Sequence, residues 1–335
     1  MNNFFQLSAE DQQRVLQQAS ARLGLPPQAI EKDLWVTTIL QIVFALPFAD
    51  KLIFKGGTSL SKVWHQIERF SEDIDLAVDR SLFDMEGNLT KKQIKKLRKE
   101  SSLFVKEQFC PALQSKVDEY GLSALCTIEA EPDGEGDNTY PEPRKVFVKY
   151  RSAWAEPMDY LSPVVMLEIG ARSLFEPNEK TNIHSMVEDL FPSIRTTLVD
   201  SLVITALASK TFLEKAFLLH ELFSVEGRGT TAERKSRHLY DLSRMMKEDF
   251  ALAAIHDDEL WESIRHHREI FTSVRGMDYT PDVRKHISLI PPDDIRAVWE
   301  QDYKSMCSSM IFGNKPTFDE LLEQMKVLEA RFHEA

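Results

Sequence analysis

The sequence has few cysteines. It contains only three among 335 residues, Cys110, Cys126 and Cys307, which are far apart and form no Cys-x-x-Cys pair. An odd number of isolated cysteines argues against a disulfide framework and against a structural zinc site. We therefore expect a protein of a reducing compartment, the cytoplasm.

Long apolar runs and an excess of basic residues are also missing. The most apolar stretch, residues 34–49, is too short to span a bilayer and contains Gln41 and Pro47, so we expect a buried helix and no membrane association. No basic start followed by an apolar run opens the chain, which predicts no signal peptide. The formal net charge of −12 means that any nucleic-acid partner must meet a local basic surface.

Length and periodicity predict two lobes. A chain of 335 residues exceeds what one hydrophobic core usually organises. Two helix patterns open the chain, and strand patterns follow at 51–55, 73–78, 125–131, 145–150 and 164–170. After residues 173–193, which are rich in loop signals, the pattern is almost entirely helical. We predict an α+β fold in which residues 1–198 form a lobe with N-terminal helices and a small mixed sheet, and residues 199–335 form an α-helical lobe.

A glycine turn in the first lobe is suited to hold phosphate. Gly56 and Gly57 end a predicted strand and precede a short helix, so the backbone can approach phosphate oxygens and the N–H groups of the helix start can face the anion. The hydroxyl of Thr58 or Ser59 adds a donor. The resulting candidates for nucleotide binding are Gly56, Gly57, Thr58, Ser59 and Lys62.

Two aspartates follow on the next predicted strand. Side chains alternate along a strand, so Asp73 and Asp75 share one face with their backbones about 6.6 Å apart. Carboxylates at this spacing can converge on two Mg²⁺ ions roughly 3.5–4 Å apart, as nucleotidyl transfer requires. By itself Asp-x-Asp is often only a solvated strand end. A metal-dependent glycosyltransferase also uses this pair, but its chemistry has no evident place for the glycine turn.

Several stretches together resemble one family. Gly-Gly-Thr-Ser-Leu-Ser-Lys at 56–62 and Arg-Phe-Ser-Glu-Asp-Ile-Asp-Leu at 69–76 are similar to the signature of AbiEii/AbiGii toxins, a branch of the DNA polymerase β-like nucleotidyltransferases. Further matching stretches are 31–33, 167–172, 211–215, 219–221 and 237–242, with a weaker one at 302–303. The resemblance thus covers most of the chain.

The resemblance implies further site residues. The superfamily usually carries a third carboxylate on a later strand, as general base or metal ligand, and Glu168 is the candidate; the alternative is a carboxylate paired with Arg172. A lysine after glutamate in the helical lobe faces the nucleotide in this family, which implies that Lys215 neutralises triphosphate charge. Asp241 matches the family's last motif and would position Lys215 or an adjacent arginine. Toxins of this family are associated with nucleotide transfer to RNA, notably the 3′ end of tRNA, and are usually encoded with an antitoxin.

One basic cluster stands out in the acidic chain. Lysines recur at i, i+3, i+4 and i+7 along one side of a predicted helix that shows Ile94 and Leu97 on the other: Lys92, Lys95, Lys96 and Lys99. Such a stripe is either a solvated helix face or a surface that holds an RNA backbone.

The function that we expect, in part from this resemblance, is a Mg²⁺-dependent nucleotidyltransferase that moves a nucleoside monophosphate from an NTP to RNA, with tRNA as the expected acceptor. It would act as a toxin of a toxin–antitoxin or phage-defence system, with a cognate antitoxin as a possible partner. Two alternatives remain open at this point: transfer to a protein side chain, and a GTP-binding effector without transfer. The base, the acceptor and the oligomeric state are not fixed by the sequence.

Overall fold

The structure is a computed structural model that describes residues 2–136, 139–154, 161–196 and 202–335. It divides the chain into two compact units. The first unit comprises Met1–Val63 and Phe70–Ala206, and the second comprises Trp64–Arg69 and Leu207–Ala335. The short segment Trp64–Arg69 therefore leaves the first unit, joins the second and returns between the glycine turn and the aspartates.

The first unit is built on a seven-stranded mixed sheet in the part of the chain that the structure describes. Its strands lie in the order β4-β5-β6-β3-β2-β9-β7. Their bounds are β2 (Leu52–Lys55), β3 (Ile74–Val78), β4 (Cys126–Ala130), β5 (Arg144–Tyr150), β6 (Val164–Gly170), β7 (Asn178–Thr181) and β9 (Val203–Ala206). The pairs β2–β9 and β3–β6 are parallel, and the other neighbours are antiparallel.

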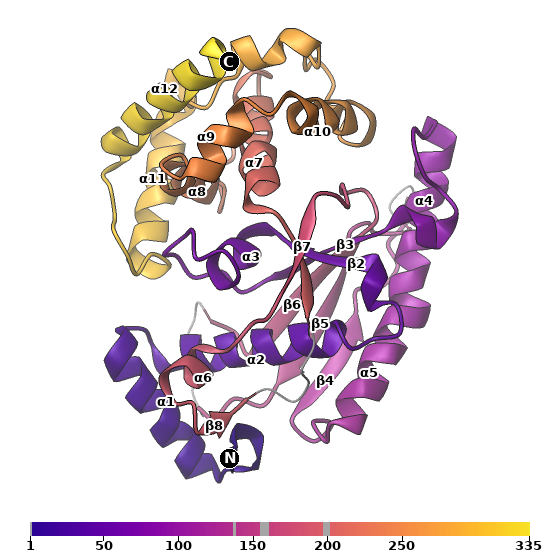
Figure 1. Ribbon diagram of the computed structural model, residues 1–335, viewed down its shortest axis with the longest axis vertical. Helices are drawn as coiled ribbons and strands as arrows, with labels where there is room; N and C mark the ends of the chain where they lie inside the picture. The colour runs from indigo at the N-terminus through magenta and orange to yellow at the C-terminus, as the bar shows by residue number, and fades with distance from the viewer. Residues whose placement is uncertain (1, 137–138, 155–160, 197–201) are drawn as a thin grey trace. The chain divides into compact units, whose positions relative to one another are not determined.

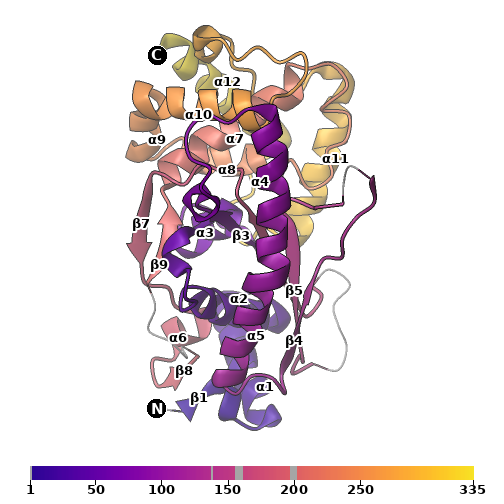
Figure 2. The same cartoon turned by 90° about the vertical axis from the view of Figure 1, so that its right-hand side faces the viewer.

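Helices of the first unit pack on this sheet (Figure 1). Helix α2 (Pro27–Val43) contacts β6 and is buried from Ala29 to Val43, so the predicted buried helix is present and its charged residues are enclosed as well. Figure 2 shows α4 (Lys91–Phe104), the π-helical η4 (Val105–Phe109) and α5 (Cys110–Glu119) as one continuous rod. The remaining elements are β1 (Asn2–Asn3), η1 (Phe4–Gln6), α1 (Ala9–Leu23), η2 (Ala49–Lys51), α3 (Gly56–Lys62), η3 (Arg80–Phe83), α6 (Met186–Leu190) and β8 (Ile194–Arg195).

The second unit is helical. Helix α7 (Ala208–Phe223) packs against α8 (Arg237–Met245), α9 (Asp249–Ile255) and α10 (Asp258–Phe271). The other elements are η6 (Pro281–His286), α11 (Asp293–Ser309) and α12 (Phe318–Glu334). The ring centroids of Phe217 and Trp261 lie 4.5 Å apart, and those of Trp261 and Phe332 lie 5.6 Å apart, so aromatic rings on three helices form one core. Among the described residues, no helix is both long and apolar enough to cross a membrane.

The structure confirms the predicted α+β fold, with a mixed sheet in the first unit and helices in the second. The almost entirely helical pattern predicted after residue 193 misses the short strands β8 and β9. Strand β9 pairs in parallel with β2. Its run Val203-Ile204-Thr205 is β-branched, and Val203 and Thr205 are fully buried, so a strand signal was present but short. The expected lobe boundary after residue 198 falls within 197–201, outside the described residues, whereas the units divide after Ala206.

Candidate active site

The glycine turn is closed by the second aspartate. Gly56 follows β2 with φ +82°, a left-handed conformation that side chains rarely adopt. A Cβ atom at this position would overlap the carboxylate of Asp75 and lie 2.9 Å from its Cγ. Only a residue without a side chain therefore lets the turn and this carboxylate meet, and the two parts of the motif are neighbours in the first unit.

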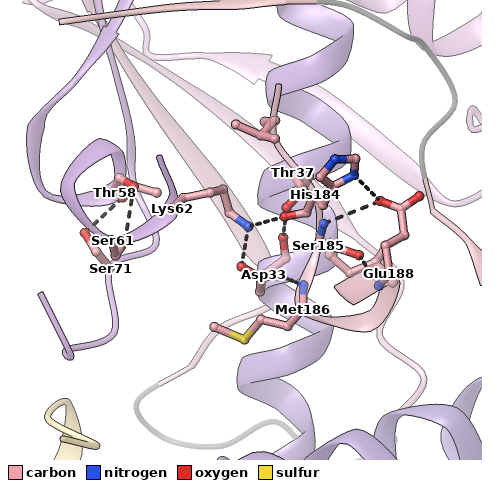
Figure 3. Close-up of polar contacts among 12 residues, drawn as sticks. Asp33, Thr37, Thr58, Ser61, Lys62, Ser71, His184, Ser185, Met186 and Glu188 are labelled. Atoms are coloured by element: carbon pink, nitrogen blue, oxygen red, sulfur yellow. Dashed lines mark hydrogen bonds and ion pairs between the residues drawn. The ribbon is translucent and has the colours of Figure 1, made fainter. Parts of the chain in front are cut away.

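The hydroxyl of Thr58 joins the turn to the strand of aspartates. It donates to the backbone carbonyl of Asp73 at 2.6 Å. It also lies 2.9 Å from the Ser71 hydroxyl (Figure 3). Thr58 and Ser59 are both buried, and Ser59 Oγ donates to the carbonyl of Gly56 at 2.8 Å. These hydroxyls fix the turn itself, so a phosphate would meet the backbone of the turn before it met either side chain.

Lys62, the last residue of α3, packs against α2. Its Nζ lies 2.6 Å from Asp33 Oδ1 and donates to the carbonyl of His184 at 3.2 Å (Figure 3). The side chain points toward α2, and only 7% of it is exposed. The structure therefore gives Lys62 a partner that sequence reasoning did not foresee.

The third predicted carboxylate lies beside Asp75. Asp75 on β3 pairs in register with Glu168 on the parallel strand β6, and paired residues of neighbouring strands lie about 5 Å apart on one face. Lys55 on β2 and Lys145 on β5 continue the same row. All four residues are partly exposed, whereas their neighbours along the strands are mostly buried. The row thus presents two carboxylates flanked by two lysines on an accessible sheet face.

Glu168 pairs with Lys145 and not with Arg172. Its Oε1 lies 3.6 Å from Lys145 Nζ, while Arg172 pairs with the buried carboxylate of Glu142. Asp73 lies one residue before β3 begins, and so only Asp75 of the pair is a member of the strand. In the described parts of the chain no three His, Cys, Asp or Glu side chains converge closely enough to bind a metal without a further ligand. Oxygen donors from one or two carboxylates completed by substrate phosphates are nonetheless the usual environment of Mg²⁺, and Asp75 with Glu168 fits it.

A second cluster of charged groups is buried in the second unit. Asp241 on α8 accepts hydrogen bonds from Arg69 Nε at 2.7 Å and Nη2 at 2.8 Å. Its Oδ2 also lies 2.9 Å from Lys215 Nζ, which in turn lies 3.3 Å from His238 Nδ1. Asp241 therefore positions both Lys215 and an arginine, and the arginine is Arg69, at the end of the segment that visits this unit.

Burial and charge set the protonation of this cluster. Burial opposes the charge of Asp241, but Arg69 and Lys215 outweigh it and hold the pKa of this carboxyl far below its usual range. Burial and then the Lys215 charge hold the pKa of His238 well below 6.5, so its ring is neutral and Nδ1 accepts from the lysine. Burial also lowers the pKa of Lys215, although Asp241 counteracts it. The anionic carboxylate of Asp241 therefore contacts both Arg69 and Lys215, and the neutral ring of His238 lies beside Lys215.

Asp302 supports the start of α8. Its carboxylate accepts hydrogen bonds from the backbone N–H groups of Arg234, at 2.8 Å, and Ser236, at 2.9 Å. The Ser236 hydroxyl donates to the same oxygen at 2.5 Å. The matching stretch at 302–303 thus fixes the loop that leads into the helix of His238 and Asp241.

Comparison with known families gives a match over most of the chain. A family model described as nucleotidyl transferase AbiEii toxin, type IV toxin–antitoxin system, matches residues 38–324. The chain belongs to this family. It is accordingly a nucleotidyltransferase of the AbiEii type, which confirms the resemblance and the enzyme class inferred from its motifs. The match includes Gly56, Asp75, Glu168, Lys215 and Asp241 but begins after Glu31, Lys32 and Asp33.

A solved structure shares the fold. The nucleotidyltransferase toxin MenT4 from Mycobacterium tuberculosis H37Rv aligns with 98% of this chain and 88% of its own, at 14% sequence identity and a TM-score of 0.50. At this identity the likeness concerns the fold alone. No curated protein matches the AbiEii chain by sequence.

Proposed function

We propose that this AbiEii protein transfers a nucleoside monophosphate from an NTP to the end of an RNA, with tRNA as the acceptor, and that it does so with Mg²⁺ in the cytoplasm. The observation that carries the proposal is the contact between Gly56 and Asp75, with Glu168 in register beside it. It combines a turn that accepts phosphate with the carboxylates that a divalent metal requires.

Asp73, Asp75 and Glu168 would hold the metal, which when bound would neutralise the triphosphate and lower the barrier to attack at the α-phosphorus. In the reaction a hydroxyl of the acceptor forms a bond to that phosphorus, and the bond to pyrophosphate breaks. Glu168 is suited to accept the hydroxyl proton, because it is a partly exposed carboxylate in register with Asp75. Lys215 would add positive charge to the departing pyrophosphate, as the family resemblance implies.

An RNA acceptor is supported by the lysine stripe on α4, defined by Lys92, Lys95, Lys96 and Lys99. All four side chains are exposed, while Leu97 is buried. Lysines in the first turn of a helix oppose its dipole, and the first turn of α4 contains no acidic residue to offset them. Of the stripe, Lys92 lies in this turn and therefore costs α4 some stability, which is consistent with a role outside the helix, in binding phosphate.

The decisive experiment incubates the protein with Mg²⁺, total RNA and each α-labelled NTP in turn. Labelled RNA and released pyrophosphate are expected, and Asp75→Asn and Glu168→Gln should each reduce both at least a hundredfold. Asp79→Asn is the matched control, because Asp79 follows the same strand but its carboxylate accepts from Ser81 N and lies outside the row. Label on protein instead would favour protein modification, and bound GTP without pyrophosphate would favour a binding module; either result would overturn the proposal.

The toxin class implies an antitoxin. We propose a cognate antitoxin gene adjacent to this one, whose expression relieves growth arrest caused by the wild-type protein. The same arrest should disappear with Asp75→Asn and persist with Asp79→Asn. Arrest that survives Asp75→Asn would separate toxicity from nucleotide transfer.

A further inference from the structure

Two neighbouring residues of α2 hold the two halves of the nucleotide motif. Asp33 Oδ1 lies 2.6 Å from Nζ of Lys62, the last residue of α3 (Figure 3). Lys32 forms an ion pair with Glu72, which directly precedes Asp73. Both residues of α2 are buried, at 3% and 7% exposure. Helix α2 thus forms ion pairs with the chain at two points, the end of α3 and the residue just before Asp73.

Most of the chain between these two ion pairs, Trp64–Arg69, belongs to the second unit. It leaves the first unit after Val63 and returns at Phe70. Lys62 is next to the point of departure, and Glu72 is close to the point of return. The covalent connection through Trp64–Arg69 therefore does not by itself set the separation of the turn and the strand. The pairing of β2 with β3 and the Thr58 hydrogen bond to Asp73 link them directly, and the ion pairs of α2 add contacts at the end of α3 and just before β3.

The ion pairs are anchored to the rest of the first unit. Lys32 Nζ also donates to the carbonyl of Ser162 at 3.1 Å. Asp33 Oδ2 accepts from the backbone N–H of Met186 at 2.8 Å. Because Lys32 and Asp33 each have a second partner, the position of each side chain is fixed from two directions.

Burial of these charges is not needed for stability as such. Packed apolar side chains of similar volume usually stabilise a core as well as a buried ion pair does. A buried pair instead fixes distance and direction, since its energy depends on close hydrogen-bond geometry. The contact of Gly56 with Asp75 leaves no room for even one methyl group, so a small shift of either half would disturb it.

We infer that Lys32 and Asp33 are positioning residues of the transferase site: Asp33 sets α3 and with it the Gly56 turn, and Lys32 sets Glu72 and with it Asp73 and Asp75. The inference rests on the function proposed for this site. It assigns a role to the charged residues of α2, which lie outside the range that the family model matches.

The test compares Lys32→Met and Asp33→Asn with Glu31→Gln. Glu31 is a buried carboxylate of the same helix that accepts from Ser152 Oγ and Ala153 N, both at 2.6 Å, and therefore controls for loss of a buried charge. For each variant, pyrophosphate release gives kcat and KM for the NTP, and urea unfolding gives the folded fraction. Per folded molecule, kcat should fall at least tenfold in Lys32→Met and Asp33→Asn and change less than threefold in Glu31→Gln. Equal kcat in all three, whatever their stability, would overturn the inference.

A second readout does not depend on activity. Amide hydrogen exchange at residues 72–76 should become at least tenfold faster in Lys32→Met, and exchange at 57–62 should do so in Asp33→Asn, with neither change in Glu31→Gln. If the wild type transfers no nucleotide, the proposed function fails, while these exchange rates still decide whether α2 fixes the two segments. Unchanged exchange would overturn the positioning role by itself.

Two further variants keep the test decisive if a single one does not fold. The reversed pair Lys32→Glu/Glu72→Lys should recover at least part of the kcat that Lys32→Glu loses. The apolar pair Lys32→Met/Glu72→Leu should regain stability but not kcat. Wild-type kcat in the folded apolar pair would show that any packed contact suffices, which contradicts the inference.

Discussion

Arg69 and Asp241 form a buried bidentate ion pair, with hydrogen bonds of 2.7 and 2.8 Å, although they are far apart in sequence. Arg69 is 1% exposed and Asp241 is fully buried. The pair attaches the segment Trp64–Arg69 to the helical unit. The chain rejoins the first unit at Phe70 and then reaches the aspartates of the site. Glu68 supports the same connection, since its carbonyl accepts from Phe312 N at 3.1 Å.

Loss of the Asp241 charge should strongly destabilise the protein. Asp241→Asn leaves the cations Arg69 and Lys215 buried without their anion, which typically costs about 3–5 kcal/mol. Urea unfolding of wild type and variant measures this directly. In a background of Arg69→Met and Lys215→Met, which removes both cations, Asp241→Asn should cost far less. An equal cost in both backgrounds would mean that the carboxylate stabilises the fold by another contact.

The effect of Lys215 on nucleotide transfer should be separable from its effect on stability. Lys215→Met leaves the balanced pair of Arg69 and Asp241, so we expect little loss of stability but a reduction of transfer of at least a hundredfold. Lys247→Met, at an exposed position just after α8, is the control and should be fully active. The transfer rate at saturating Mg²⁺ and NTP is the measurement. A fully active Lys215→Met would remove this lysine from catalysis and leave it as a structural member of the cluster.

Gly56 should tolerate no side chain. In Gly56→Ala the added Cβ displaces the Asp75 carboxylate, and a shift of about 1 Å at a reacting centre can cost roughly a hundredfold in rate. Gly24→Ala is the matched control, because Gly24 also has positive φ, +67°, but its Cβ would meet no atom within 4 Å. Both variants should lose about 1–2 kcal/mol of stability from backbone strain. Only Gly56→Ala should lose transfer, and an active Gly56→Ala would argue against the proposed site.

The sequence predicted the parts of the site that depend on local pattern. The strand, glycine turn and strand around Gly56 and Asp75 follow from breakers and period-two alternation, which are read within a few residues. The register of Asp75 with Glu168 depends on strand order, and sequence reasoning reached Glu168 only through the family resemblance.

Partners distant in the sequence were missed for a physical reason. A lysine at the end of a short helix and an arginine in a connection both look like solvated charges, and nothing local shows that Lys62 meets Asp33 or that Arg69 meets Asp241. The signal for Arg69 was its place in a matching stretch, and the signal for α2 was three consecutive charges inside an apolar helix. Charges within an otherwise buried segment require buried partners, and this rule indicates that partners exist without naming them.

The lysine stripe should govern RNA affinity but not nucleotide affinity. Changing all four lysines to glutamine should weaken RNA binding and make the plot of log K against log salt shallower, by about 0.7 for each phosphate of a single strand that the protein no longer neutralises. A matched control changes four exposed lysines of the second unit to glutamine, with the same loss of charge: Lys285, Lys304, Lys315 and Lys326. Equal slopes in the two quadruple variants would show that net charge, and not the stripe, determines binding.

Acid should destabilise the helical unit in part through His220. Burial lowers the pKa of this ring to about 4, and its Nδ1 accepts from Ser288 N at 2.9 Å. As the pH falls through about 6.5, His220 becomes protonated in the unfolded chain but stays neutral in the folded chain. The contribution of His220 to the unfolding free energy is therefore present at neutral pH, declines as the pH falls from about 6.5 to 4, and does not change further below that range.

His220→Asn keeps a hydrogen-bond acceptor at this position but does not titrate. Between pH 7 and pH 5 the wild type should lose about 2 kcal/mol more unfolding free energy than the variant, as measured in urea. The contribution of buried His238 is common to both proteins and cancels. Parallel pH dependences of the two proteins would mean that His220 is protonated in the folded state.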